Sequence, residues 1–369
     1  MIIPPAHRTE TVREYYFSVK NREIAALNAE RTSRGEKPVI NLGIGSPDGT
    51  PPREALETLS ALAVQDGVHG YQSYMGTPEL RKAYADWYRR YYGVTLDPAT
   101  EIQPLTGSKE GILLSCLTFL NEGDGVLVPD PGYPTYTSAS LLSGARASRE
   151  LYARLVDFAT RHKILIINDN PYSFIRNREP LSILSVPGAK ACCLEMNSLS
   201  KAHNMAGWRL GLIAGEAAAV REVLKVKSQM DSGIFRPLQL AAVEALKAGP
   251  EWFDALNAEY RRRATVAGEI LDTLGAVYDP DSAGLFLFGR VPAALSALPV
   301  PSGTPAEQME GKSLGEQVSD RVLYGAGVFL TPGFIFGRNG ENYIRISLCA
   351  PVPVLEEALE RCKLLINNK

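Results

Sequence analysis

The sequence is poor in the residues that build metal sites and disulfide scaffolds. Only four of its 369 residues are histidines, and their positions match no ligand spacing, so a zinc site is not expected. The five cysteines are odd in number, form no C-x-x-C pair and have apolar neighbours. This usage predicts reduced thiols and a cytoplasmic protein.

Long hydrophobic runs and a strong net charge are also missing. No stretch is long enough to cross a bilayer, and no apolar segment opens the chain, so no membrane association is expected. The 39 basic and 41 acidic side chains leave a net charge of −2, which gives no electrostatic case for nucleic acid. With 45% hydrophobic residues, the chain can bury a substantial core in one large or two medium domains.

What the sequence does contain is a lysine between two buried segments. The apolar runs 191–196 and 210–214 predict strands, so Lys201 is expected in the loop between them. Poor solvation there disfavours the charged form of the lysine and makes its amine available as a nucleophile. Such an amine forms a Schiff base with a carbonyl. The alternative is a solvated lysine in a surface loop.

The neighbours of this lysine suit a phosphate group. Ser198 and Ser200 offer hydroxyls, and Arg209 offers a guanidinium fork. Pyridoxal 5'-phosphate (PLP) is a small molecule that carries both an aldehyde and a phosphate. The sequence therefore indicates PLP as the cofactor.

The Ser-x-Ser-Lys motif at 198–201 is followed by Gly-Trp-Arg-x-Gly at 207–211. This stretch resembles the signature of the class I and II aminotransferases, the fold-type I PLP enzymes, and the resemblance extends from Val39 to the C-terminus. It implies an α/β fold with a mostly parallel sheet in a large domain flanked by helices, plus a smaller α+β domain. The expected division is an N-terminal arm and helix of the small domain (1–40), a large PLP-binding domain (41–275) and a C-terminal small domain (276–369).

A glycine turn is expected to hold the cofactor's phosphate. The turn at 107–109 leads into an apolar helix at 112–120, and a helix N-terminus presents free amides and a positive dipole end to an anion. We expect the backbone amides of Ser108 and Lys109 to bind the phosphate. The alternative is an ordinary capped helix.

Two tyrosines receive roles from the resemblance. Tyr133 follows a predicted strand at 125–129 and matches the aromatic residue that stacks on the pyridine ring. Tyr71 matches the residue that crosses a homodimer interface to the neighbour's phosphate, and Tyr74 is the less favoured candidate. The resemblance thus implies a homodimer with a shared active site.

Asp169 ends an apolar strand predicted at 163–168. A carboxylate there is costly unless it is paired, and the pyridine nitrogen of PLP is a cationic partner that holds it ionised. By the resemblance, Tyr172 bonds the cofactor's phenolic oxygen. An aspartate that only forms a turn is the alternative.

Two residues are expected to bind the substrate. Arg345 lies in an apolar strand, where an unpaired guanidinium is expensive, and it matches the arginine that clamps the α-carboxylate. Gly45 lies in a glycine turn and matches the residue whose amide meets the same carboxylate. The role of Arg236 remains open: it either binds a distal group of the substrate or is a surface residue.

The sequence departs from the family between Tyr133 and Asp169. The family has an extra strand–helix–strand crossover there, ending in a turn whose Asn bonds the phenolic oxygen. Residues 142–150 leave no room for it, since a parallel crossover needs about a dozen residues or more. Either the protein lacks this unit or the sequence omits disordered residues. We favour omission, which predicts a Cα–Cα distance well above about 3.8 Å within 143–148.

These observations predict a PLP-dependent aminotransferase that moves an amino group from an amino acid to a 2-oxo acid by a ping-pong mechanism. In this reading Lys201, Asp169 and Tyr172 are the catalytic residues. Two alternatives remain open: a PLP-dependent lyase on the same fold, such as a C–S β-lyase, and a non-catalytic aminotransferase-like binding protein.

Overall fold

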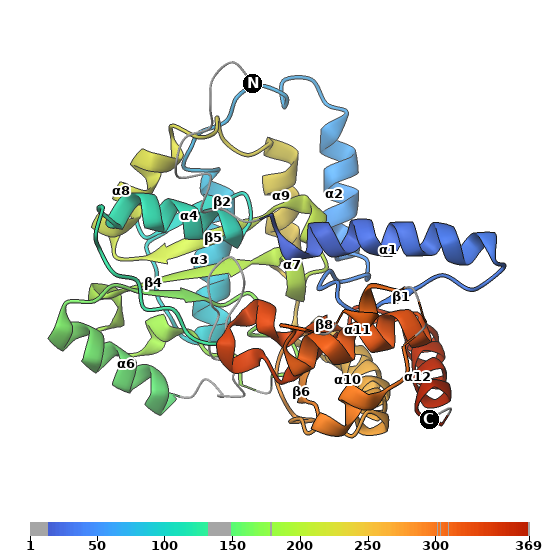
Figure 1. The fold of residues 1–369 in the computed structure, drawn as a ribbon. Helices are drawn as coiled ribbons and strands as arrows, with labels where there is room; N and C mark the ends of the chain where they lie inside the picture. Colours follow the sequence, from blue (N-terminus) through green and yellow to red (C-terminus); the bar gives the residue numbers. More distant parts are fainter. Residues whose placement is uncertain are drawn as a thin grey trace, which may run out of the picture.

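The structure is a computed structural model of the 369-residue chain. It describes residues 14–131 and 149–367, except 178, 301, 303 and 309. This part of the chain forms an α/β fold in which helices cover both faces of a central sheet (Figure 1). None of the helices described has the length and apolar character needed to cross a membrane.

The central sheet has four strands in the order β2-β5-β4-β3. Their bounds are Ile102–Leu105 for β2, Gly211–Gly215 for β5, Cys193–Ser198 for β4 and Ile166–Asp169 for β3. β3 pairs with β4 in parallel, whereas β5 runs antiparallel to both β2 and β4. Three of the four described strands therefore run in one direction, and β5 alone opposes them.

Three helices cover the faces of this sheet: α3 (Pro78–Tyr92), α4 (Ser108–Phe119) and α8 (Ala217–Lys227). Leu194 and Met196 of β4 share an apolar cluster with residues of α4 and α8. Glu195, between them, accepts a 2.9 Å hydrogen bond from the hydroxyl of Tyr88 in α3. Because side chains alternate along a strand, β4 faces α4 and α8 on one side and α3 on the other.

The C-terminal part is built on a three-stranded antiparallel sheet in the order β6-β9-β8. Its strands are β6 (Phe286–Arg290), β9 (Tyr343–Ser347) and β8 (Thr331–Pro332). A parallel pair, β1 (Ile40–Asn41) with β7 (Val328–Phe329), lies beside it. The helices of this part are α10 (Pro250–Thr273), α11 (Leu314–Ala326) and α12 (Val352–Asn367).

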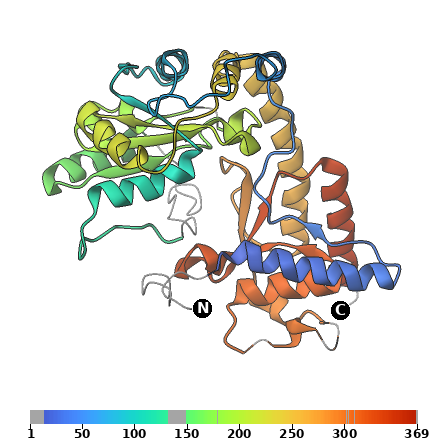
Figure 2. The same cartoon turned by 90° about the horizontal axis from the view of Figure 1, so that it is seen from above.

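The first described helix, α1 (Tyr16–Ser33), lies along the C-terminal part, beside α11 (Figures 1 and 2). Lys20 of α1 makes a 3.3 Å ion pair with Asp320, and Tyr324 donates a 2.7 Å hydrogen bond to Glu23. The beginning and the end of the described chain thus pack together. The remaining α-helices are α2 (Arg53–Ala63), α6 (Arg149–His162), α7 (Leu199–Ala202) and α9 (Arg236–Ala245).

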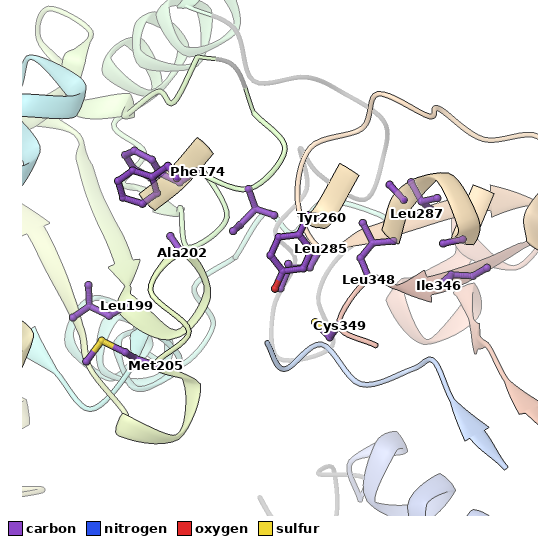
Figure 3. Close-up of a cluster of buried hydrophobic side chains, with 14 of the residues drawn as sticks. Phe174, Leu199, Ala202, Met205, Tyr260, Leu285, Leu287, Ile346, Leu348 and Cys349 are labelled. Atoms are coloured by element: carbon purple, nitrogen blue, oxygen red, sulfur yellow. The ribbon is translucent and has the colours of Figure 1, made fainter. Parts of the chain in front are cut away.

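A continuous cluster of buried apolar side chains joins the central sheet to the C-terminal sheet. Figure 3 shows Leu199 and Met205 on one side of it and Leu287 and Ile346 on the other, with Tyr260 between them. Burial of apolar side chains is the main favourable contribution to folding. The same cluster therefore holds the two sheets together behind the site described below.

The bounds of α3 follow from the residues at its two ends. Thr77 adopts an extended backbone, and its hydroxyl accepts a 3.3 Å hydrogen bond from the amide of Leu80. Pro78 occupies the first turn, where its missing N–H costs nothing. Gly93 ends the helix in the left-handed conformation at φ 66°.

The strand predicted at 125–129 is wrong. These residues form no strand, and Val126, Leu127 and Val128 are 57%, 82% and 50% exposed. A strand needs a neighbour to satisfy its backbone N–H and C=O groups. β3 has β4 on one side only, and no other described strand lies on its free side to pair with this segment. The window 143–148, where a chain break is predicted, lies outside the described residues.

Candidate active site

A cavity of about 860 Å³ lies where the central sheet, the C-terminal sheet and the start of α1 meet. Figure 2 shows the central sheet and the C-terminal part as separate bodies with α10 running beside them. Ten of the twelve predicted site residues line this cavity: Gly45, Ser108, Lys109, Asp169, Tyr172, Ser198, Ser200, Lys201, Arg209 and Arg345. The fold therefore brings together positions up to 300 residues apart.

Lys201 lies in the short helix α7, not in the open loop that the sequence predicts. Ser198 caps this helix by accepting a 3.1 Å hydrogen bond from the amide of Ser200, which turns the chain directly from β4 into a helical turn. The Nζ atom of Lys201 donates a 2.6 Å hydrogen bond to the carbonyl oxygen of Gly45 and lies 5.8 Å from the ring centre of Tyr172.

Burial lowers the pKa of the Lys201 ammonium below its usual range. The positive charges of Arg209 and Arg345 lower this pKa further, while Asp169 opposes the shift. Desolvation penalises the charged form of an amine, so the neutral form becomes accessible nearer to neutral pH. This is the property that a nucleophilic lysine needs.

An anion cradle lies beside this lysine and consists of Gly107, Ser108, Ser198, Ser200 and Arg209. The Ser198 hydroxyl donates to that of Ser200 at 2.9 Å. The Arg209 guanidinium donates to the carbonyl oxygen of Ala206 at 3.0 Å. Gly107 has φ +81°, and a Cβ there would collide with the Arg209 guanidinium. Only glycine brings the turn so close to the arginine.

Arg345 is held by backbone and aromatic contacts. It is 4% exposed, and its Nη2 atom donates a 3.0 Å hydrogen bond to the carbonyl oxygen of Gly43. Its guanidinium carbon lies 3.8 Å from the ring centre of Phe286 and 4.6 Å from that of Phe336. Aromatic faces attract a cation, so these rings fix the arginine within reach of the cavity.

Asp169 and Tyr172 follow each other at the end of β3. Asp169 is the last residue of this strand and lies opposite Met196 of β4. Tyr172 comes in the turn after it, with its ring centre 6.1 Å from that of Phe286. β3 therefore delivers both side chains to the cavity at its C-terminal end, where open α/β sheets bind their ligands.

Three of the described residues named from the sequence do not line this cavity. Tyr71 and Tyr74 are 92% and 43% exposed and do not line it. Arg236 is exposed at the start of α9, as expected of a surface arginine. Tyr133 lies outside the described residues.

The cavity also contains residues that sequence reasoning missed. Tyr15 and Phe17, at the start of α1, line it together with Phe286. The ring of Phe17 lies 5.6 Å from the Arg345 guanidinium carbon, and that of Tyr15 lies 4.9 Å from the Lys109 Nζ atom. The aromatic run at 15–17 was the available signal, but nothing in it indicates that an N-terminal helix reaches the site.

Comparisons with known proteins settle the family. The profile of "Aminotransferase class I and II" matches residues 37–146 and 138–361. The chain belongs to the class I and II aminotransferases. It is therefore a PLP-dependent aminotransferase, an enzyme that transfers an amino group from an amino acid to a 2-oxo acid by a ping-pong mechanism, and its fold is of type I.

Individual relatives resemble this aminotransferase over its whole length. An LL-diaminopimelate aminotransferase from Desulforudis audaxviator is 35% identical, with 97% of each chain covered. The apo-BacF structure from Bacillus subtilis gives a TM-score of 0.85 at 29% identity, covering 99% of this chain and 98% of that one. A probable N-succinyldiaminopimelate aminotransferase from Thermus thermophilus gives 0.80 at 29%, covering 94% and 99%.

The alignments bear on the missing crossover. The match to the Desulforudis enzyme spans 402 positions, more than the 369 residues of this aminotransferase, so the relative has residues without a counterpart here. The two parts of the family match meet at residues 138–146, next to the expected place of the crossover. The Desulforudis enzyme thus contains residues that this sequence lacks.

The family implies PLP, and the residues present fit it. A primary amine with a lowered pKa stands beside an anion cradle that a side chain at Gly107 would fill. Asp169, at the end of β3, lines the same cavity. The site thus contains a group for the aldehyde, a group for the phosphate and a carboxylate for the ring nitrogen.

Proposed function

We propose that this aminotransferase binds PLP through Lys201 and uses a dicarboxylic amino acid of the diaminopimelate type as amino donor. The observation that carries the cofactor assignment is the Lys201 amine, with its lowered pKa, 2.6 Å from the carbonyl oxygen of Gly45 and beside the anion cradle. When bound, PLP supplies the electron sink for a carbanion at the substrate's α-carbon.

The positions of the described residues support a role for each of them. Ser198, Ser200 and Arg209 bind the phosphate together with the amides of Ser108 and Lys109. With PLP bound, Asp169 would accept a hydrogen bond from the pyridinium nitrogen, and Tyr172 would bond the phenolic oxygen. By the family resemblance, Tyr133, which lies outside the described residues, would stack on the ring.

With PLP bound, the Lys201 amine would hold and move the proton taken from the substrate's α-carbon. Arg345 binds the α-carboxylate as a bidentate fork, and the amide of Gly45 contacts the same group. The cation–π contacts of Arg345 with Phe286 and Phe336 keep the fork oriented before substrate arrives.

A second cation supports a second carboxylate on the substrate. The Lys109 side chain lines the cavity, and its Nζ atom lies 4.9 Å above the ring of Tyr15. Relatives whose names specify LL-diaminopimelate are 31–35% identical to this chain. A diaminopimelate has two carboxylates, of which Arg345 takes one and Lys109 the other.

Tyr71 supports a homodimer with a shared site. Its side chain is 92% exposed and does not line the cavity of its own chain. We propose that it reaches the phosphate bound by the partner subunit in a cytoplasmic homodimer. An exposed aromatic ring of this size is typical of a residue that a partner covers.

A screen of half-reactions tests the proposal. The protein is loaded with PLP, and loss of the visible absorbance of the Lys201-bound cofactor is followed with single amino acids. We expect the fastest loss with LL-diaminopimelate and a slower one with aspartate or glutamate. Lys109→Met is expected to reduce the advantage of LL-diaminopimelate and leave alanine unaffected. No preference for a dicarboxylic donor would refute the substrate assignment.

A further inference from the structure

Lys227, the last residue of α8, is a buried cation outside the cavity. It is 1% exposed, and its Nζ atom forms ion pairs with Asp231, one helical turn on, and with Glu110 of α4, whose Oε1 atom is 3.8 Å away. An ammonium in such a place is costly unless its partners compensate the lost hydration. Two carboxylates from different elements therefore converge on this amine.

Glu110 connects this cation to the phosphate turn. One carboxylate oxygen faces Lys227, while the other, Oε2, accepts a 2.6 Å hydrogen bond from the amide of Thr106. Thr106 directly precedes Gly107 and Ser108 of the anion cradle. The carboxylate thus bridges a buried positive charge and the residue that precedes the turn.

Asp231 connects the same cation to a second loop. Its Oδ1 atom accepts a 3.1 Å hydrogen bond from the amide of Gly233, while its Oδ2 atom pairs with Lys227. The carbonyl oxygen of Ser232, within this loop, accepts a 3.3 Å hydrogen bond from the amide of Gln72. Gln72 follows Tyr71, so the second branch ends beside the residue proposed to serve the partner's site.

We propose that Lys227 is a positioning residue that sets the geometry of the phosphate turn through Glu110, and that of the Tyr71 loop through Asp231. The proposal rests on the proposed binding of the PLP phosphate at residues 107–109. Without the ammonium, Glu110 and Asp231 face each other with no shared counter-ion. The Glu110 carboxylate then loses the ion pair that fixes its orientation, and with it the hydrogen bond to the Thr106 amide weakens.

Cofactor affinity separates this role from a general effect on folding. PLP and pyridoxal, which lacks the phosphate, are titrated into cofactor-free Lys227→Met and wild type, and binding is followed by absorbance. We expect the dissociation constant for PLP to rise about tenfold or more, with that for pyridoxal nearly unchanged. Lys225→Met is the matched control, because Lys225 lies on the same helix, 64% exposed and paired with Glu222.

A second variant keeps the test decisive if Lys227→Met does not fold. Glu110→Ala removes the bridge while leaving Lys227 paired with Asp231, and we expect it to weaken PLP binding to a similar extent. Where Lys227→Met folds, the double variant is expected to bind PLP no more weakly than Lys227→Met alone, since loss of the ammonium already breaks the connection through Glu110.

Two results overturn the proposal. One is an unchanged PLP affinity in folded Lys227→Met or Glu110→Ala, and the other is an equal loss of affinity for PLP and pyridoxal. Failure of the proposed function gives a different result, because wild type itself would then show no Schiff-base absorbance with either aldehyde.

Discussion

Lys201 and Gly45 are 156 positions apart, yet the Nζ atom of one donates a 2.6 Å hydrogen bond to the carbonyl oxygen of the other. Lys201 reaches this position from α7, after β4, and Gly45 from the turn after β1. The bond connects the end of the central sheet to the segment that contains Gly45 and Gly43. The carbonyl oxygen of Gly43 in turn accepts a hydrogen bond from Arg345. The amine is therefore held beside Gly45, the residue proposed to bind the substrate carboxylate.

The first prediction concerns this amine. Lys201→Ala is expected to abolish transamination, because it removes the amine proposed to move the proton from the α-carbon. PLP should still bind non-covalently, since the anion cradle is intact. Equilibrium dialysis and single-turnover assays measure the two effects separately. Lys225→Ala, at an exposed position, is the control. Substantial turnover by Lys201→Ala would disprove the assignment.

A second prediction concerns Arg345. Arg345→Ala is expected to raise the KM for amino acids tens- to thousands-fold, because losing a buried charged hydrogen-bond pair costs about 2–5 kcal/mol. Arg345→Lys should also be poor, since an ammonium cannot form the bidentate fork. Steady-state kinetics measure both, with the exposed Arg290 of the neighbouring strand changed to Ala as control. An unchanged KM would assign Arg345 a purely structural role.

The parts of the site that were predictable are those with local motifs. Ser198, Ser200 and Lys201 lie in one short stretch, so their proximity was predictable, whereas the helical turn that Ser198 caps was not. Asp169 was predictable because a carboxylate at the end of an apolar strand is expensive without a partner. Arg345 in β9 was predictable for the same reason, because burying an unpaired guanidinium costs free energy.

The rest depends on contacts between distant segments. Phe17 reaches Arg345 only because α1 packs on α11 through pairs such as Lys20 with Asp320. The segment 125–129 has the composition of a strand, but strand formation depends on a neighbour that the described part of the chain does not provide. Local sequence patterns therefore predict neither the packing of α1 on α11 nor the lack of a partner strand for 125–129.

The corrected segment yields a third prediction. Leu127 is 82% exposed, so Leu127→Ala should change the free energy of unfolding by less than about 0.5 kcal/mol. Leu114→Ala, the same change at a fully buried position of α4, should cost about 2–5 kcal/mol because it leaves a cavity. Urea unfolding of both variants measures the difference. Equal losses would mean that residues 125–129 are packed in a strand in solution.

The last prediction concerns pH and the buried His203, two residues after Lys201. It is 1% exposed, and neither ring nitrogen has a hydrogen-bond partner in the described part of the structure. Its nearest rings include Phe253 and Trp87, with centres 5.7 and 6.3 Å away. Burial lowers the pKa of His203 from 6.5 to about 3.

This shift destabilises the fold in acid. Well above pH 6.5 the imidazole is neutral in both states and contributes nothing to the pH dependence. Between pH 6.5 and 3 the unfolded chain binds a proton that the folded chain does not, so the free energy of unfolding falls by about 1.4 kcal/mol per pH unit. His203→Gln should remove this component, while the same change at the exposed His162 should leave it. Urea unfolding at a series of pH values compares the three proteins. If His203→Gln and wild type lose stability in parallel down to about pH 4, the buried imidazole is not the cause.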